Sequence, residues 1–250
     1  MYNDLFSIGP VTVHGYGLCI GLGTVLALLL AWRRAEKRGI PSDRVTELGA
    51  LVLICGFVGA KLLFVITRFP QFLKDPWSVL GSEGFVVYGG LLLGLAAAYW
   101  WCRRREQTPL LWTDLLLPGV ALAQGFGRVG CFLAGCCYGL PTSSPLGVVF
   151  PVGSGAPAGI PLWPVQLFSA VGDWLIAAVL LLLAKKERPQ GTLTAAYLVL
   201  YGVGRFLIEF LRNDERGAVG IFSTSQFISF FFLAGAAALY FRVKNKKQPS

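Results

Sequence analysis

The stretch VTVHGYGLCIGLGTVLALLLAW, from Val11 to Trp32, is an apolar run of the length that a membrane-spanning helix needs. Similar runs recur along the 250-residue chain, in which 55% of residues are hydrophobic, 14% are charged and the mean hydropathy is +0.63. These values lie outside the range of soluble domains. No secretory signal, with one short apolar core and a cleavage site, is evident. The composition predicts an integral membrane protein.

The apolar runs predict an all-α fold with seven transmembrane helices in a single polytopic domain. The predicted spans are residues 11–32, 45–66, 84–102, 113–136, 164–184, 192–211 and 221–241. The longest polar interval, residues 138–163, is rich in Pro, Gly and Ser and has no Lys or Arg. We expect it to be an irregular outer loop that either covers a binding site, receives a protein substrate or is a passive connector.

Positive charge is distributed unevenly between the two sides of the predicted bundle. The loops and C-terminal tail on one side carry 15 Lys and Arg residues, whereas the other side carries 4. The positive-inside rule therefore places the N-terminus outside and the C-terminus in the cytoplasm. A basic face against anionic lipid explains the net charge of +9, and no nucleic-acid-binding motif is present. The expected setting is a membrane, without a nucleic-acid partner.

Three basic residues, Lys61, Arg128 and Arg205, lie inside predicted spans. A charge near the bilayer centre costs about 2.5–3.5 kcal/mol, so such residues usually face a partner, a water-filled cavity or a ligand. In the predicted topology all three fall in the outer halves of their spans, close to glycines that allow helices to approach. We expect them to converge on an anion, and phosphate matches the guanidinium fork. Snorkelling or structural ion pairing is the alternative.

Other polar residues gather near the outer ends of the spans. Glu209 follows Arg205 by four residues, so an ion pair along one helix is expected to orient the arginine. His14, the only histidine in the chain, and Tyr16 open the first span, and Tyr88 opens the third. Their alternative roles are those of interfacial aromatic residues and of a hydrogen-bonded structural histidine.

Six motifs, in order, resemble those of the prolipoprotein diacylglyceryl transferase family. They are FSIGPVTVHGYGL (Phe6–Leu18), FPQFLKDP (Phe69–Pro76), YGGLLLG (Tyr88–Gly94), GRVGCFLAGCCYG (Gly127–Gly139), PLWPVQLF (Pro161–Phe168) and YGVGRFLIEFLR (Tyr201–Arg212). The resemblance implies a multi-pass enzyme of a bacterial-type inner membrane. Its reaction would move a diacylglyceryl group from phosphatidylglycerol, or another anionic phospholipid, to the lipobox cysteine of a prolipoprotein. No cofactor is expected.

The resemblance also implies roles for particular residues. Arg128 and Arg205 match the two phospholipid-handling arginines of the family, and Tyr16 matches a functional tyrosine of the first span. Tyr88 and Cys136 complete the predicted catalytic set. The predicted substrate-binding set consists of Lys61, His14, Gly89, Gly90, Gly130, Cys131, Gly139, Gln166 and Glu209.

Several positions depart from the family pattern, which reads approximately G-R-x-G-N-F-x-N-x-E-x-x-G. Cys131 and Ala134 replace its asparagines, Cys136 replaces its glutamate, Tyr88 and Trp163 replace histidines, and Lys61 replaces an arginine. The acceptor proton would then pass to Tyr88, Tyr16 or His14. The alternatives are a relative with a different acceptor, a non-catalytic lipid-binding protein and a thiol oxidoreductase. A transporter is less favoured, because no repeat is evident.

Cys131, Cys136 and Cys137 lie at the outer end of the fourth span, close to an oxidising compartment. Cys136 could act as a nucleophile, Cys131 or Cys136 could form a disulfide, or the three could be simple small-residue substitutions. No metal site is predicted, because no His or carboxylate is nearby in the sequence and the spacing is not a paired C-x-x-C. Cysteines elsewhere are expected to be packing residues.

Overall fold

A computed structural model describes residues 4–8, 11–82, 84–214, 218–219 and 222–245. The described chain is mostly helical and forms two compact units. The larger unit contains Met1–Ala31 and Thr113–Ser250, and the smaller unit contains Trp32–Trp112. The single polytopic domain expected from the sequence stays a prediction.

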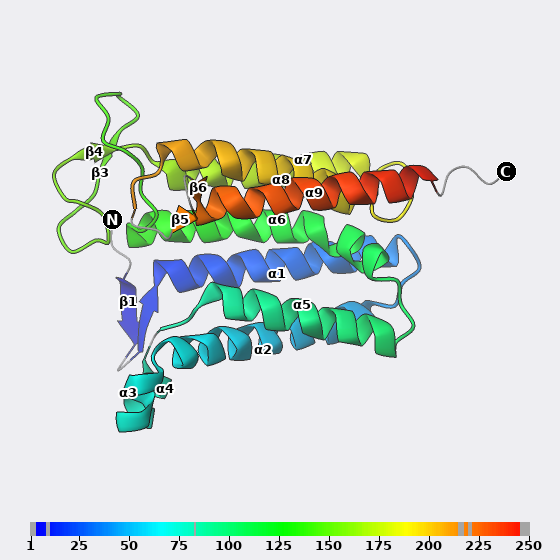
Figure 1. The fold of residues 1–250 in the computed structure, drawn as a ribbon, viewed down its shortest axis with the longest axis horizontal. Helices are drawn as coiled ribbons and strands as arrows, with labels where there is room; N and C mark the ends of the chain where they lie inside the picture. Colours follow the sequence, from blue (N-terminus) through cyan, green and yellow to red (C-terminus); the bar gives the residue numbers. More distant parts are fainter. Residues whose placement is uncertain (1–3, 9–10, 83, 215–217, 220–221, 246–250) are drawn as a thin grey trace. The chain divides into compact units, whose positions relative to one another are not determined.

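The larger unit holds most of the long helices. They are α1 (Gly15–Glu36), α6 (Pro109–Ala134), α7 (Val165–Leu183), α8 (Thr192–Ile208) with the 3-10 turn η1 (Glu209–Leu211), and α9 (Thr224–Asn245) (Figure 1). One end each of α1 and α6 belongs to the smaller unit. Helix α8 packs against both α7 and α9. Aromatic rings contact one another along this packing: Tyr201 stacks on Tyr197 with ring centroids 5.4 Å apart, and its ring is tilted against that of Phe232 at 5.7 Å.

A buried carboxylate fixes the start of α8 against α6. Asp114, only 4% exposed, accepts hydrogen bonds from the backbone N–H groups of Gly191 at 2.7 Å and Thr194 at 2.8 Å. It also accepts one from the Thr194 hydroxyl at 2.6 Å. Because the first N–H groups of a helix have no partner within the helix, a carboxylate from another helix satisfies them here. Gly191 has a φ of +92°, which favours glycine.

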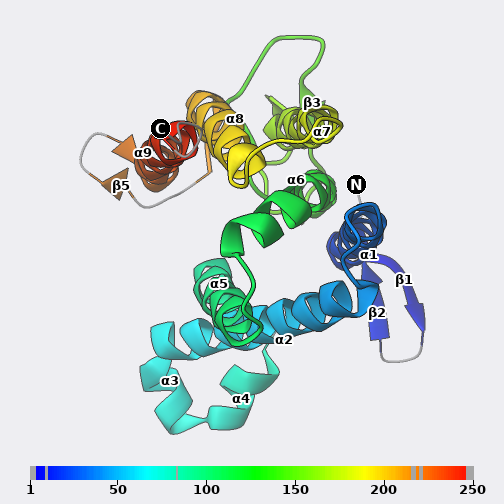
Figure 2. The ribbon, with the colours of Figure 1, turned by 90° about the vertical axis from the view of Figure 1, so that its right-hand side faces the viewer.

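The smaller unit is built on the pair formed by α2 (Ser42–Thr67) and α5 (Val87–Arg104), with α3 (Phe69–Lys74) and α4 (Pro76–Gly81) between them in the chain (Figure 2). Glycines let the two backbones approach closely. A Cβ added to Gly59 would collide with the carbonyl of Gly89, and one added to Gly90 would lie 2.7 Å from the carbonyl oxygen of Gly56. This contact between small residues is typical of membrane helices. Gly89 and Gly90 therefore have a packing role.

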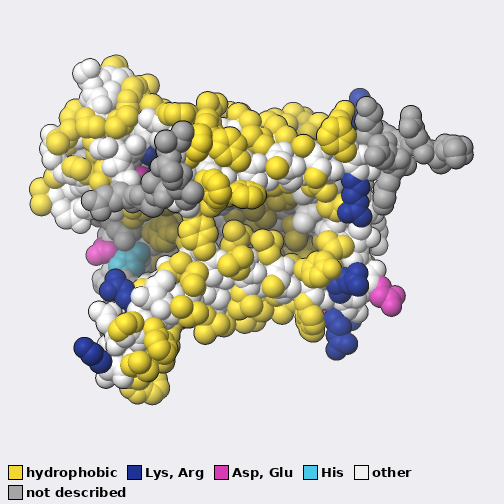
Figure 3. All heavy atoms as spheres, viewed as in Figure 1, with side chains coloured by type: hydrophobic (Ala, Val, Ile, Leu, Met, Phe, Trp, Pro, Cys, Tyr) yellow, Lys and Arg dark blue, Asp and Glu magenta, His cyan; other side chains and the backbone are white. Residues whose placement is uncertain are grey.

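Six helices of the described chain are long and apolar enough to cross a membrane, by length and composition: α1, α2, α6, α7, α8 with η1, and α9. Figure 3 shows apolar side chains along the flanks of the helices, with Lys and Arg gathered at their ends. The predicted helical membrane protein is confirmed. Helix α5, with 18 residues, does not meet the same criteria, so the count of seven stays a prediction.

The first predicted span begins in a strand rather than in a helix. Residues 11–14 form strand β2 (Val11–His14), which pairs antiparallel with β1 (Asp4–Ile8), because β-branched residues there favour extended backbone. The last predicted span begins at residue 221, which lies outside the described residues, and helix α9 begins at Thr224. It follows a hairpin of β5 (Ala218–Val219) and β6 (Phe222–Ser223).

The predicted outer loop, residues 138–163, contains no helix but is more ordered than expected. Strands β3 (Val148–Val149) and β4 (Pro161–Leu162) pair antiparallel within it. Phe150, Ala156 and Leu162 form a small core with exposures of 1%, 7% and 1%. The loop therefore has its own folded centre.

Candidate functional site

A pocket of about 310 Å³ lies in the larger unit among α6, α7 and α8. Its polar lining consists of Arg128 from α6, Ser169 and Asp173 from α7, and Tyr201 and Arg205 from α8. The rest of the lining is apolar apart from glycine, and includes Phe168, Ile176 and Leu211. The two arginines predicted to converge therefore share one cavity. An apolar pocket with two cations suits an amphipathic anion.

Arg205 is held in place by two neighbours. Its Nη1 lies 3.0 Å from Oε2 of Glu209, and these side chains are only 13% and 6% exposed. Its Nη2 donates a hydrogen bond of 2.7 Å to the hydroxyl of Ser225 on α9. The predicted ion pair along the helix is confirmed. Two anchors on one guanidinium fix its direction and leave its remaining N–H groups for another acceptor.

Arg128 is in a different electrostatic position. Among the described residues, no carboxylate lies within ion-pair distance of its half-buried guanidinium and no side-chain hydrogen bond holds it. Its electrostatic neighbours include Tyr201 and Asp173. A desolvated cation without a close counterion favours an anionic ligand. Arg128 is therefore the more available of the two pocket cations.

Asp173 is a pocket residue that the sequence interpretation missed. It is 6% exposed, lines the cavity and interacts electrostatically with both Arg128 and Arg205. The available signal was its position as the only charged residue in the apolar run 164–184. A buried charge inside a membrane span is a candidate site residue in its own right.

Tyr16 lies beside the same part of α6. A Cβ added to Gly130 would lie 3.1 Å from Cδ2 of Tyr16 and 3.2 Å from its backbone, so the absence of a side chain at Gly130 makes room for the tyrosine. Tyr16 also interacts electrostatically with Arg128 and with the cysteines that follow it. The structure thus brings together Tyr16, Gly130 and Arg128.

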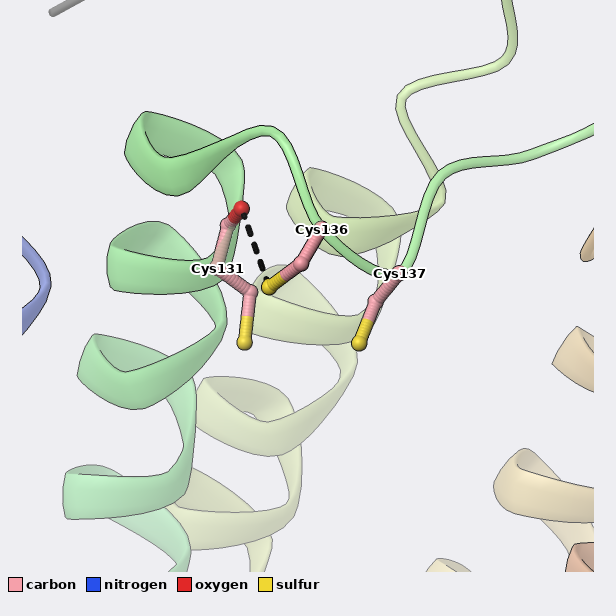
Figure 4. Close-up of side chains that lie close together, drawn as sticks. All are labelled: Cys131, Cys136 and Cys137. Atoms are coloured by element: carbon pink, nitrogen blue, oxygen red, sulfur yellow. Dashed lines mark hydrogen bonds between the residues drawn. The ribbon is translucent and has the colours of Figure 1, made fainter. Parts of the chain in front are cut away.

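The three predicted cysteines converge at the end of α6 (Figure 4). The helix ends at Ala134, so Cys136 lies on the following loop and not within the fourth span as predicted. The Sγ atoms of Cys131, Cys136 and Cys137 lie within 4.8 Å of one another, and all three cysteines are free. The disulfide considered from the sequence is therefore absent between them.

The electrostatic surroundings of Cys137 favour its thiolate. The neighbouring thiols of Cys131 and Cys136, together with the nearby Arg212 guanidinium, lower the pKa of the Cys137 thiol. Gln166, predicted to bind substrate, is 1% exposed and donates a hydrogen bond of 2.8 Å from Nε2 to the carbonyl oxygen of Cys136. Gln166 thus holds the loop that carries two of the thiols.

Gly139 and His14 have structural partners. A Cβ on Gly139 would lie 2.6 Å from the carbonyl oxygen of Trp163 and 2.8 Å from that of Leu211, so a side chain does not fit at this isolated β-bridge. His14 Nδ1 lies 2.6 Å from Oδ1 of Asp4, across the hairpin of β1 and β2. These contacts account for both residues without a ligand, and their substrate-binding roles stay predictions.

Lys61 and Tyr88 belong to the smaller unit. Lys61 donates hydrogen bonds from Nζ to the carbonyl oxygens of Ser82 at 2.6 Å and Gly84 at 3.3 Å. The ammonium also lies 4.9 Å from the ring centroid of Phe85. Tyr88 is 51% exposed at the start of α5. The predicted convergence of Lys61 with the two arginines stays a prediction.

Comparisons with known proteins show the family of the chain. The model of the family described as prolipoprotein diacylglyceryl transferase matches residues 3–242. The chain is 42% identical over 248 residues to phosphatidylglycerol–prolipoprotein diacylglyceryl transferase 2 of Clostridium perfringens, covering 98% of this chain and 97% of the relative. It is 43% identical over 233 residues to the phosphatidylglycerol–prolipoprotein diacylglyceryl transferase of Clostridium tetani, covering 91% and 92%. The chain belongs to the prolipoprotein diacylglyceryl transferase family.

Proposed function

We propose that this protein is a membrane transferase that moves the diacylglyceryl group of phosphatidylglycerol to the cysteine thiol of a prolipoprotein. The observation that carries the proposal is the cavity shared by Arg128 and Arg205, in a chain of this family. A phosphodiester fits there because its charge meets two guanidinium groups while its acyl chains meet apolar lining or lipid.

The arginines act where charge develops. As the thiol sulfur attacks the glycerol carbon, the C–O bond breaks and its electron pair leaves with the phosphate oxygen of glycerol phosphate. Arg128 and Arg205 stabilise that leaving group, which carries more negative charge than the bound diester. Glu209 keeps Arg205 directed at the phosphate. The negative charge of Asp173 partly offsets the cost of burying two cations in one pocket. Tyr16, which interacts electrostatically with Arg128, would contact the acceptor.

The proposal includes a multi-pass topology in a bacterial inner membrane, with the N-terminus outside and the C-terminus in the cytoplasm. Helix α5 would be the seventh span, since its 18 residues measure about 27 Å, close to the hydrocarbon thickness of about 30 Å. Basic residues in the last turns of α1 (Arg33, Arg34) and α5 (Arg103, Arg104) support a cytoplasmic location for those ends.

Turnover tests the function directly. Purified protein in nanodiscs containing phosphatidylglycerol is incubated with a lipobox peptide. Mass spectrometry then measures the increase in peptide mass from the added diacylglyceryl group. Arg128→Ala and Arg205→Ala should each slow transfer about 100- to 1,000-fold, the usual effect of removing a group that stabilises developing charge. Lys185→Ala, at an exposed position after α7, is the matched control and should transfer normally.

The same experiment separates the alternatives. Protein that binds phosphatidylglycerol but leaves the peptide mass unchanged would be a lipid-binding protein rather than a transferase. Transfer to water or to a small thiol, with the peptide left unmodified, would indicate a different acceptor.

A further inference from the structure

The cluster of Cys131, Cys136 and Cys137 is built by an unusual local backbone. Gly135, directly after α6, has a φ of +72°, and Cys137 has a φ of +61°, which is rare for a residue with a side chain. The backbone N–H of Cys136 donates a hydrogen bond of 3.1 Å to the carbonyl oxygen of Cys131, and the Cys136 thiol donates to the same oxygen at 3.6 Å. With Gln166 on the Cys136 carbonyl, the loop is held from two sides. Strain of this kind concentrates at functional sites.

The sulfur positions suit a shared metal ion. Zinc–sulfur bonds of 2.3 Å place two ligand sulfurs of a tetrahedral site about 3.8 Å apart. The three Sγ atoms already lie within 4.8 Å of one another. Side-chain rotations that move each sulfur by about 1 Å or less would bring the three atoms to the spacing of a zinc site. In Figure 4 the three side chains extend toward the same side of the loop.

The ligand set also indicates which ion fits. Thiolates select soft or borderline ions such as Zn²⁺. No fourth His, Cys, Asp or Glu joins the group among the residues that the structure describes, so the fourth position of a tetrahedral ion is not filled by these side chains. Structural zinc sites are closed by four protein ligands, whereas sites that act on substrates keep one position open.

We propose that Cys131, Cys136 and Cys137 bind one Zn²⁺ ion as three thiolates, and that the open fourth position holds the thiolate of the acceptor cysteine. The second half of this inference rests on the proposed function. Three thiolates and Zn²⁺ carry one net negative charge, and Arg128 lies one helical turn before Cys131, about 4.5 Å along the axis. The metal site would thus adjoin the pocket that holds the phosphodiester.

The ion would supply the thiolate that the reaction requires. A thiol that coordinates zinc loses its proton, which here passes to water. The metal-bound sulfur then attacks the glycerol carbon, the C–O bond breaks, and its electron pair departs with glycerol phosphate. The thioether product leaves the zinc, whose charge and three cysteine ligands are unchanged. This assignment makes Cys136 a metal ligand in place of the nucleophile considered from the sequence.

Metal binding is tested on the full chain in nanodiscs. After treatment with a chelator, the protein is reloaded with Zn²⁺ and its zinc content is measured by mass spectrometry. The wild type should retain about one equivalent, while Cys131→Ser, Cys136→Ser and Cys137→Ser should each weaken binding by more than about 100-fold. Cys19→Ser and Cys55→Ser remove cysteines outside the cluster and should bind as the wild type does.

X-ray absorption of the zinc-loaded wild type provides a measurement that does not depend on how the variants fold. Three sulfur ligands support the site. Zinc bound by fewer sulfurs, or equal zinc retention by wild type and the three cluster variants, would overturn it.

Transfer assays then separate this inference from the proposed function. Removal of zinc should slow peptide modification about 100- to 10,000-fold, the range for losing deprotonation of a nucleophile, and added Zn²⁺ should restore it. Transfer at the full rate by protein that is verified to be free of metal would overturn the proposed activation of the acceptor thiolate by zinc. The proposed transferase function would be unaffected. Zinc-loaded protein that modifies no peptide would overturn the transferase and, with it, the acceptor's place on the metal.

Discussion

Substitution of Glu209 by glutamine should reveal how strongly burial makes Arg205 depend on its partner. The two charged atoms are 3.0 Å apart, and the side chains are 13% and 6% exposed. Glu209→Gln keeps the shape and removes the charge, while the hydrogen bond from Arg205 to Ser225 at 2.7 Å remains. Removing one partner of a buried ion pair costs about 3–5 kcal/mol. Because the glutamine oxygen can still accept a hydrogen bond, we expect the lower end, about 3 kcal/mol.

The assay is the free energy of unfolding, from denaturant titration in mixed micelles. The chain offers a matched control in the pair formed by Glu47 and Arg105, whose side chains are 42% and 53% exposed. Glu47→Gln should leave the unfolding curve unchanged, because solvent screens exposed pairs. In the transfer assay Glu209→Gln should also raise the KM for phosphatidylglycerol, since Arg205 loses its fixed direction. Equal unfolding curves for the two variants would refute the reasoning from burial.

Three further predictions concern the larger unit. Asp114→Ala leaves three hydrogen-bond donors at the start of α8 without their acceptor and should lower the free energy of unfolding by about 3 kcal/mol, with Asp114→Asn affected less. Gly130→Val forces a side chain against Tyr16 and should destabilise by about 1–3 kcal/mol, while Gly127→Ala, with nothing within 4 Å, should be neutral in thermal unfolding. Gln166→Leu frees the cysteine loop and should weaken zinc binding about tenfold in a competition titration.

Much of the pocket could be predicted from the sequence because membrane insertion restricts charge so strongly. Arg128 and Arg205 were predicted to meet from their depth in the spans and the glycines beside them, and both line one cavity. Glu209 was predicted as the partner of Arg205 from a spacing of four residues, which an α-helix converts directly into proximity.

Other features of the site depend on tertiary packing, which the periodicity of the sequence does not predict. Asp173 comes from α7, and its approach to the arginines follows from helix packing rather than from local spacing. The sequence does not predict the close approach of the three cysteine sulfurs. Cys131 meets Cys136 and Cys137 only through the left-handed turn that begins at Gly135. Hydropathy predicts a helix where strand β2 lies, because it does not distinguish an apolar strand from the start of a span.

The unequal support of the two pocket arginines bears on how the bundle is assembled during biosynthesis. The 3-10 turn η1, which continues α8, carries Glu209 one turn from Arg205, so this segment contains its own counterion when it leaves the translocon. No acidic residue lies within two turns of Arg128 on α6, so its charge enters lipid at a cost of about 2.5–3.5 kcal/mol. Asp173, which interacts electrostatically with Arg128, lies on α7 and is synthesised later, so α6 gains this interaction only after α7 has been made.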